Sequence, residues 1–168
     1  MKLRDNNIDF RFITYDDDVD SFNCGNNSIN DYLKTKSLYD SLYREGSTTL
    51  AFDNSELVGF CTLSRVNISQ IDTEALLIQY LAVSSDKQDT GIGSTIIEYI
   101  VDVSLTTNER YIFLEALKDD ELELIGWYKR RGFIITDEDE LEDSTKSKVW
   151  MYMDLLDEES LEMIFNNP

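Results

Sequence analysis

The longest apolar run in the chain covers residues 75–83, which read Ala-Leu-Leu-Ile-Gln-Tyr-Leu-Ala-Val. Such a continuous run is typical of a strand that is buried on both faces, as in the parallel part of a sheet. Polar residues end the run at 84–87, and Gly91 and Gly93 follow. Isoleucines and valines then recur at helical spacing, which predicts a helix over residues 92–106.

A second segment of high β propensity covers residues 110–117 and predicts another strand. The connection from the first strand is long enough for a parallel crossover, which would be right-handed. Residues 119–121 (Asp-Asp-Glu) offer an N-cap and an acidic first turn for a helix that runs to about Arg131. Gly132 suits the C′ position that ends such a helix.

The rest of the pattern predicts shorter elements. Asn27 or Ser28 caps a helix that places one apolar face toward the core, formed by Ile29, Leu33, Leu38 and Leu42. The other expected elements are a strand over 8–15, a hairpin of 47–52 with 57–66 turning at Asp53-Asn54, a short strand after Phe133, an acidic loop over 137–143, a strand over 148–155 and a helix over 158–165.

The turn with Gly91 and Gly93 is the first candidate for chemistry. Glycine lets the backbone turn sharply and approach a ligand closely, and the first N–H groups of a helix favour an anion. A pyrophosphate would suit this turn; the alternative is that both glycines only make a tight turn. No Gly-Lys-Ser/Thr follows, which argues against a nucleoside triphosphate loop, and two glycines instead of three argue against a dinucleotide fold.

Two short motifs resemble those of the Gcn5-related N-acetyltransferase (GNAT) family. The signature Gln/Arg-x-x-Gly-x-Gly/Ala matches at Gln88, Gly91 and Gly93, after the run Tyr-Leu-Ala-Val. The element Tyr-x-x-x-Gly-Phe matches at residues 128–133, and the spacing between the two elements also agrees with the family.

The resemblance covers residues 8–155 by element order and is specific over 76–133. It implies an α/β (α+β) GNAT fold, with a mixed central β-sheet of about seven strands flanked by helices. We expect one GNAT acetyltransferase domain over residues 1–168, since the length allows a sizeable core and no linker or repeat interrupts it.

The resemblance also implies acetyl-CoA as the cofactor. The backbone of Leu81, Ala82 and Val83 would pair with the pantetheine arm, and one of their N–H groups would polarise the thioester carbonyl. The backbone amides that would hold the pyrophosphate belong to Gln88, Asp89, Thr90, Gly91, Ile92, Gly93 and Ser94.

By the same resemblance, Tyr128 is the general acid that protonates the leaving thiolate. A phenol with an ordinary pKa of about 10 keeps its proton at neutral pH and can donate it. The alternative is a packing tyrosine beside Trp127. Glu115 is a candidate base that acts through water, or else a carboxylate that faces solvent, and direct attack without a dedicated base is a third alternative.

An upstream resemblance is finer. Residues 22–25, 29–33 and 58–64 are similar to a GNAT branch that includes toxins of toxin–antitoxin pairs, which acetylate the amino group of aminoacyl-tRNA. Those toxins tend to be basic, whereas this chain has 34 acidic and 15 basic residues and a net charge of −19. The charge suits a solvated surface or a cationic acceptor, and it argues against a nucleic-acid partner, although tRNA stays open.

The thiol and imidazole content limits other chemistry. The chain has no histidine and two cysteines, so histidine-based triads are absent and no metal site is expected. Cys24 lacks the usual partner of a nucleophilic thiolate. Reduced thiols, together with the absence of a signal-like apolar run in Met1–Asp5 and of any membrane-length apolar stretch, lead us to expect a cytoplasmic protein.

Together these observations predict an N-acetyltransferase that moves acetyl from acetyl-CoA to a primary amine of a small-molecule, peptide or protein acceptor. The alternatives are a toxin-like enzyme acting on aminoacyl-tRNA and a catalytically silent GNAT-fold binding module. The oligomeric state stays open, with a homodimer as one alternative. Loops and the first helices build the acceptor pocket in such folds, and the residues there that could contribute are Tyr15, Phe22, Asn23 and Tyr32.

Overall fold

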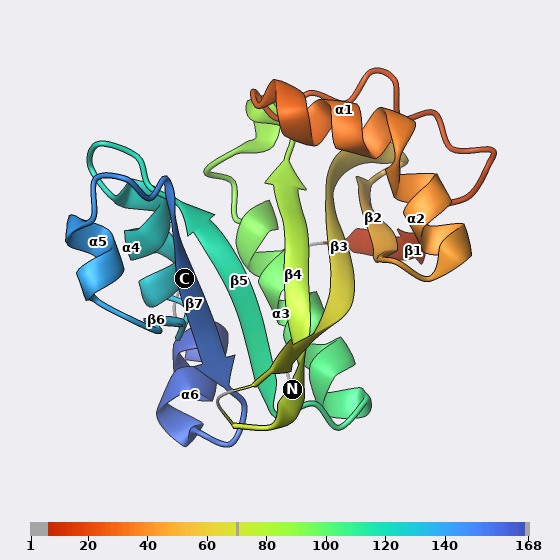
Figure 1. Ribbon diagram of the computed structural model, residues 1–168. Helices are drawn as coiled ribbons and strands as arrows, with labels where there is room; N and C mark the ends of the chain where they lie inside the picture. Colours follow the sequence, from red (N-terminus) through yellow and green to blue (C-terminus); the bar gives the residue numbers. More distant parts are fainter. Residues whose placement is uncertain (1–6, 70, 167–168) are drawn as a thin grey trace. The chain divides into compact units, whose positions relative to one another are not determined.

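A computed structural model describes residues 7–69 and 71–166 of the chain (Figure 1). The expectation drawn from Met1–Asp5 therefore lies outside the described residues. The elements are, in order, β1 (Ile8–Phe12), α1 (Asn27–Thr35), α2 (Ser37–Tyr43), β2 (Ser47–Asp53), β3 (Glu56–Ile68), β4 (Thr73–Val83), a 3₁₀ turn (Ser85–Lys87), α3 (Ile92–Thr106), β5 (Tyr111–Leu117), α4 (Glu123–Lys129), β6 (Ile134–Ile135), α5 (Asp139–Glu142), β7 (Lys148–Asp154) and α6 (Glu158–Asn166).

Within the described ranges, the strands form a seven-stranded sheet in the order β1-β2-β3-β4-β5-β7-β6. The sheet is mixed, since β4 and β5 run parallel, with Leu76 opposite Ile112, while β5 and β7 run antiparallel. The predicted fold class is therefore confirmed. Burial of β4 on both faces holds only in part, because Gln79 is exposed.

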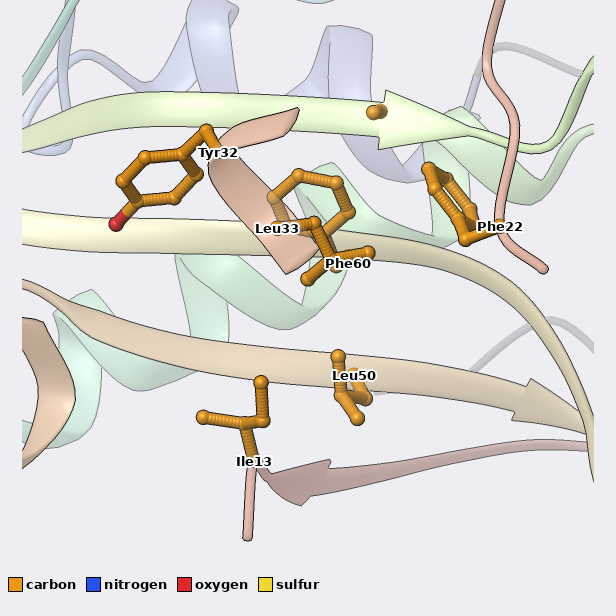
Figure 2. Close-up of a cluster of buried hydrophobic side chains, with 7 residues drawn as sticks. Ile13, Phe22, Tyr32, Leu33, Leu50 and Phe60 are labelled. Atoms are coloured by element: carbon orange, nitrogen blue, oxygen red, sulfur yellow. The ribbon is translucent and has the colours of Figure 1, made fainter. Parts of the chain in front are cut away.

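The chain divides into two compact units. The first contains Met1–Ser64 and Gln79–Tyr99. Its core is a cluster of apolar side chains from the β1–α1 connection, α1, β2, β3 and the end of β4, most of which Figure 2 labels: Ile13, Phe22, Tyr32, Leu33, Leu50, Phe60 and Ala82. Burial of this cluster fixes α1 against the strands of the first unit.

The β2–β3 hairpin forms as predicted, with a turn displaced by one residue. Asp53 pairs with Glu56, and the two turn residues are Asn54 and Ser55, with φ of 47° and 73°. Positive φ at both central positions is the requirement of a type I′ turn, which matches the twist of paired strands.

The single helix predicted after Asn27 is wrong. The structure has two helices, α1 and α2, which meet at Lys36 with a non-helical φ of −128°, and the N-cap is Asn26. The buried hydroxyl of Ser37 donates to the Leu33 carbonyl at 2.6 Å, and Asp40 is also buried. The break therefore turns polar groups inward and leaves Leu42 exposed, which a continuous amphipathic helix would have buried.

The second unit contains Arg65–Ile78 and Ile100–Pro168. Its centre is the β5–β7 pair, in which Ile112 lies opposite Met153 and Leu114 opposite Met151, all four side chains being buried. None of the described helices is long and apolar enough to cross a membrane.

The acidic segment 137–143, predicted to be a loop, contains the short helix α5. The ammonium group of Lys118 donates to the carbonyl oxygens of Glu140 and Asp143, at 2.9 and 2.8 Å. A cation at the carbonyl end of a helix satisfies its free acceptors and its dipole, which offsets the repulsion among the acidic side chains.

Helix α4 also starts later than predicted, at Glu123. Leu122, with φ of 55°, occupies the cap position, and the Asp119 carboxylate accepts the N–H groups of Glu123 and Leu124 at 2.8 and 3.2 Å. Asp119 therefore satisfies the first amides of α4 from three residues before the cap, and the helix does not begin in the acidic triplet itself.

Candidate active site

The candidate cofactor site is the turn between β4 and α3, and it has the predicted bounds. Helix α3 begins at Ile92, and Gly91 has φ of +93°, a conformation that side chains with a Cβ rarely adopt. Asp89 also has a positive φ, of 63°. Positive φ at Asp89 and at Gly91 turns the chain sharply just before α3.

Hydrogen bonds inside the turn hold its shape. The Thr90 hydroxyl donates to the Lys87 carbonyl at 2.5 Å, and the Lys87 amide donates to the Ser84 carbonyl at 2.9 Å. The Ser84 hydroxyl donates to Asp86 at 2.7 Å, which lowers the pKa of that carboxyl. The turn is thus shaped before any ligand binds, which reduces the entropy cost of binding.

The side chains of this turn supply little positive charge. Lys87 forms an ion pair with Glu56 at 3.1 Å, and Asp86 and Asp89 are exposed carboxylates. An anion at this turn would therefore be stabilised by backbone N–H groups and the dipole of α3, and not by a lysine or arginine. Such a backbone cradle fits a pyrophosphate, the group that the sequence predicted here.

The predicted pantetheine strand leads directly into this turn. Ala82 is buried, and Leu81 and Val83 are half-buried. The Ser84 amide donates to the Val58 carbonyl at 2.8 Å, which ties the end of β4 to β3. All predicted cofactor residues, Leu81–Val83 and Gln88–Ser94, accordingly lie in one continuous segment of the first unit.

The Gln88 side chain has a role that its motif does not indicate. Its amide nitrogen donates to the carbonyl oxygens of Cys24 and Val83, at 3.0 and 3.2 Å. Ser85 donates to the Asn23 carbonyl through both its amide and its hydroxyl, at 2.9 and 3.1 Å. The asparagines before α1 were the available signal, because asparagine favours caps and turns in which side chains bond the backbone.

Tyr128, the predicted general acid, lies on α4 in the second unit. Its buried ring packs edge-on against Trp127 and Phe133, with centroids 4.9 and 5.6 Å away. Burial raises the pKa of Tyr128 to about 12, although Arg131 acts in the opposite direction. The hydroxyl therefore keeps its proton at neutral pH, as an acid must.

Helix α4 ends at Lys129, two residues before the predicted end, and Gly132 lies in the turn that follows. Gly132 has φ of +86°, and the Phe133 amide donates to the Tyr128 carbonyl at 3.2 Å. A Cβ at Gly132 would lie 2.7 Å from the Ser160 carbonyl oxygen, so glycine is required here by both conformation and space. The motif glycine thus fixes the end of the helix that carries Tyr128.

The other candidates occupy different environments. Glu115 is exposed and lies 3.8 Å from the Lys148 ammonium, as expected for a carboxylate that faces solvent. Phe22 and Tyr32, considered for the acceptor pocket, belong to the buried core of the first unit, and Tyr15 is exposed. Cys24 is half-buried, with its thiol 3.7 Å from the Asn26 carbonyl oxygen.

The sequence model of the Acetyltransferase (GNAT) family matches residues 13–133. This chain belongs to that family. It is therefore an acyltransferase with acetyl-CoA as its acetyl donor, as the motifs predicted. No curated protein matches the sequence.

Toxins are among the solved structures that share this fold. A mutant of the toxin AtaT bound to the C-terminus of the antitoxin AtaR is 19% identical, with a TM-score of 0.72 over 96% of this chain and 98% of that chain. AtaTR bound with AcCoA is 20% identical, with a TM-score of 0.72 over 95% and 98%. AtaT complexed with acetyl-methionyl-tRNAfMet is 18% identical, with a TM-score of 0.71 over 95% and 99%.

Proposed function

We propose that this chain is an N-acetyltransferase that transfers acetyl from acetyl-CoA to the primary amine of aminoacyl-tRNA, within one domain spanning residues 1–168. The observation that carries the acetyl transfer is the β4–turn–α3 segment. Its Gly91 has the left-handed φ of +93° that turns the chain into the N-terminus of a long helix. Family membership supports the same chemistry.

In this proposal the backbone does most of the binding. The N–H and carbonyl groups of Leu81, Ala82 and Val83 pair with the pantetheine arm, and one N–H of that strand polarises the carbonyl to be attacked. The amides from Gln88 to Ser94 hold the pyrophosphate. Acetyl-CoA, when bound, supplies the acetyl group as an activated thioester. A backbone site is rigid, which holds the reacting carbonyl in place for the amine.

Tyr128 donates its hydroxyl proton to the departing thiolate. Its pKa of about 12 keeps it protonated, and its burial keeps water from competing for that proton. Among the similar structures, AtaT and KacT were both determined as mutants in which a tyrosine is replaced by phenylalanine, which supports a functional tyrosine in this fold. Glu115 is not assigned as the base, because its carboxylate is exposed and faces Lys148.

The acceptor assignment is supported by likeness over nearly the whole chain. AtaT complexed with acetyl-methionyl-tRNAfMet aligns with 95% of this chain and with 99% of its own length. In the toxin interpretation a protein partner would neutralise the enzyme, as AtaR binds AtaT. A net charge of −19 suits a partner segment rich in lysine and arginine.

The same charge favours a second candidate, a cationic amine such as a polyamine or a lysine-rich peptide. Of the 168 residues, 34 are acidic and 15 are basic, and such an excess attracts cations and repels phosphates at low ionic strength. An aminoacyl-tRNA acceptor requires local basic groups or a partner to overcome this field, whereas a cationic amine does not.

The deciding experiment measures thiol release from acetyl-CoA by the purified chain in separate reactions. One contains aminoacylated tRNA, a second contains spermidine with a lysine-rich peptide, and a third contains deacylated tRNA as the control. Release with aminoacyl-tRNA and not with deacylated tRNA supports the proposal. Release with the cationic amines alone overturns the tRNA assignment in favour of the second candidate. If neither reaction releases thiol, both acceptors are wrong, and a titration with acetyl-CoA separates an enzyme with another acceptor from a silent module.

A further inference from the structure

Residues 23–25, which we call the Asn23 loop, form a compact turn before α1. The Gly25 amide donates to the Asn23 side-chain oxygen at 2.9 Å, and Gly25 has φ of +85°. The buried Asn30 side chain accepts the Cys24 amide and donates to the Asn23 side chain, both at 2.9 Å. The loop is therefore joined firmly to α1 through Asn30.

The outer side of the same loop is joined to the β4–α3 turn. The Asn23 carbonyl accepts two hydrogen bonds from Ser85, and the Cys24 carbonyl accepts one from the Gln88 side chain. Gln88 and Cys24 are 64 residues apart in the sequence. A movement of the candidate cofactor turn must consequently move the Asn23 loop or break these hydrogen bonds.

The Gln88 amide has no donor left for a phosphate. A glutamine side chain carries two N–H donors and one acceptor oxygen. Its nitrogen lies 3.0 Å from the Cys24 oxygen and 3.2 Å from the Val83 oxygen, so these two carbonyls use both donors. The remaining side-chain oxygen is an acceptor, which repels an anion.

Helix α1 extends this connection to the strand of the candidate site. Tyr32 on α1 stacks on Tyr80 of β4, with ring centroids 3.8 Å apart and an interplanar angle of 13°. Tyr80 directly precedes Leu81, the first residue assigned to the pantetheine arm. Figure 1 shows α1 across the carboxyl end of β4. Helix α1 thus contacts β4 just before the proposed pantetheine residues, and the Asn23 loop contacts the turn that follows them.

We propose that Gln88 is a positioning residue, whose side chain couples the cofactor turn to the Asn23 loop and the start of α1. Binding of acetyl-CoA at the turn then stiffens the Asn23 loop through Gln88. This inference rests on the proposed function for the identity of the ligand, while the coupling itself is a property of the free chain.

Amide hydrogen exchange at Cys24 and Gly25 tests the coupling. In the free chain, Gln88→Ala removes two hydrogen bonds, and exchange at both amides is expected to be about tenfold faster than in the wild type. Gln88→Arg, which restores donors toward both carbonyls, is expected to recover most of the protection. Gln79→Ala, a glutamine change on β4 of the first unit and outside the turn, is the matched control and leaves exchange at Cys24 and Gly25 unchanged.

Acetyl-CoA supplies the second measurement. Its binding is expected to slow exchange at Cys24 and Gly25 in the wild type but not in Gln88→Ala, with both chains measured at saturating acetyl-CoA. Unchanged exchange in free Gln88→Ala would overturn the proposal, and so would a large loss of affinity with unchanged exchange, since Gln88 would then contact the ligand. If the wild type fails to bind acetyl-CoA, the proposed function fails, and the free-chain comparison still decides whether Gln88 couples the two loops.

Discussion

The backbone of Gly59 on β3 lies against the carbonyl oxygen of Ala82 on β4. A Cβ atom added to Gly59 would be 2.8 Å from that oxygen and 2.9 Å from the Cδ1 atom of Ile96 on α3. Side chains do not reach such distances without moving their neighbours. Gly59 therefore allows the proposed pantetheine strand and the helix of the cradle to pack closely against β3.

Gly59→Ala is expected to destabilise the chain by about 1–3 kcal/mol, because the new methyl group overpacks a site bounded by backbone and a buried isoleucine. It should also weaken acetyl-CoA binding by displacing Ala82. Urea unfolding and calorimetric titration measure the two effects.

Gly126→Ala is the matched control for this change. A Cβ at Gly126 would meet only the end of the Arg130 side chain, at 3.3 Å, and alanine favours a helix over glycine by roughly 1 kcal/mol. Its stability should equal or exceed that of the wild type. Equal stabilities of Gly59→Ala and the wild type would show that β3 and β4 have room for the methyl group.

Gly91→Glu is expected to abolish acetyl-CoA binding. The φ of +93° is strained for any side chain, and a carboxylate at the cradle repels the phosphates. Gly91→Ala carries the same backbone strain without the charge or the length, and should retain more affinity at a cost of roughly 1 kcal/mol in stability. Calorimetric titration compares the acetyl-CoA affinities of the two variants. Normal affinity in Gly91→Glu would place the pyrophosphate elsewhere.

Tyr128→Phe is expected to keep acetyl-CoA affinity while turnover falls about 10²-fold or more, the range for loss of a general acid. Since the pKa of Tyr128 is about 12, the proton needed for this step should remain in place up to about pH 11. Steady-state kinetics with the active acceptor measures the turnover and its dependence on pH. Tyr152→Phe, on β7 and stacked 5.5 Å from Phe113, is the control and keeps wild-type turnover. Undiminished turnover in Tyr128→Phe would remove the assigned role.

Asp119→Ala is expected to destabilise the chain by about 1 kcal/mol, because two amides at the start of α4 lose their acceptor. Asp120→Ala removes the neighbouring, exposed carboxylate and should have little effect. Urea unfolding of the pair gives the comparison. If the two variants are equally stable, Asp119 does not contribute to the helix start.

Alkaline pH should destabilise the chain partly through Cys61. Burial raises the pKa of this thiol from 9.0 to about 12. Between pH 8 and pH 10 the thiol ionises in the unfolded chain and stays protonated in the folded one, so the free energy of unfolding falls by about 1.3 kcal/mol. In Cys61→Ala this contribution disappears, and the decrease with pH is smaller by that amount. The free energy of unfolding of both chains is measured by urea unfolding at each pH. An equal decrease with pH in the wild type and in Cys61→Ala would argue against a buried, protonated thiol.

Local signals in the sequence were sufficient to predict the bounds of α3 and the turn that precedes it. Helix α3 has the predicted bounds because isoleucine and valine repeat at helical spacing up to a clear stop, and Gly91 occupies a left-handed turn that other residues resist. The same holds for Gly132, which ends the helix carrying Tyr128. Periodicity and glycine act over a few residues, so the sequence alone determines their effect.

Tertiary contacts decided the features that the sequence did not predict, namely the helix break at Lys36 and the roles of Gln88 and Gly59. Lys36 breaks the predicted single helix because Ser37 and Asp40 face the interior, and nothing in the spacing of the leucines indicates that break. Gln88 bonds the Cys24 carbonyl across 64 residues, and Gly59 is required because of Ala82 on the neighbouring strand. These roles depend on which distant backbone atoms lie within hydrogen-bond or van der Waals distance, and only the packed fold sets those distances.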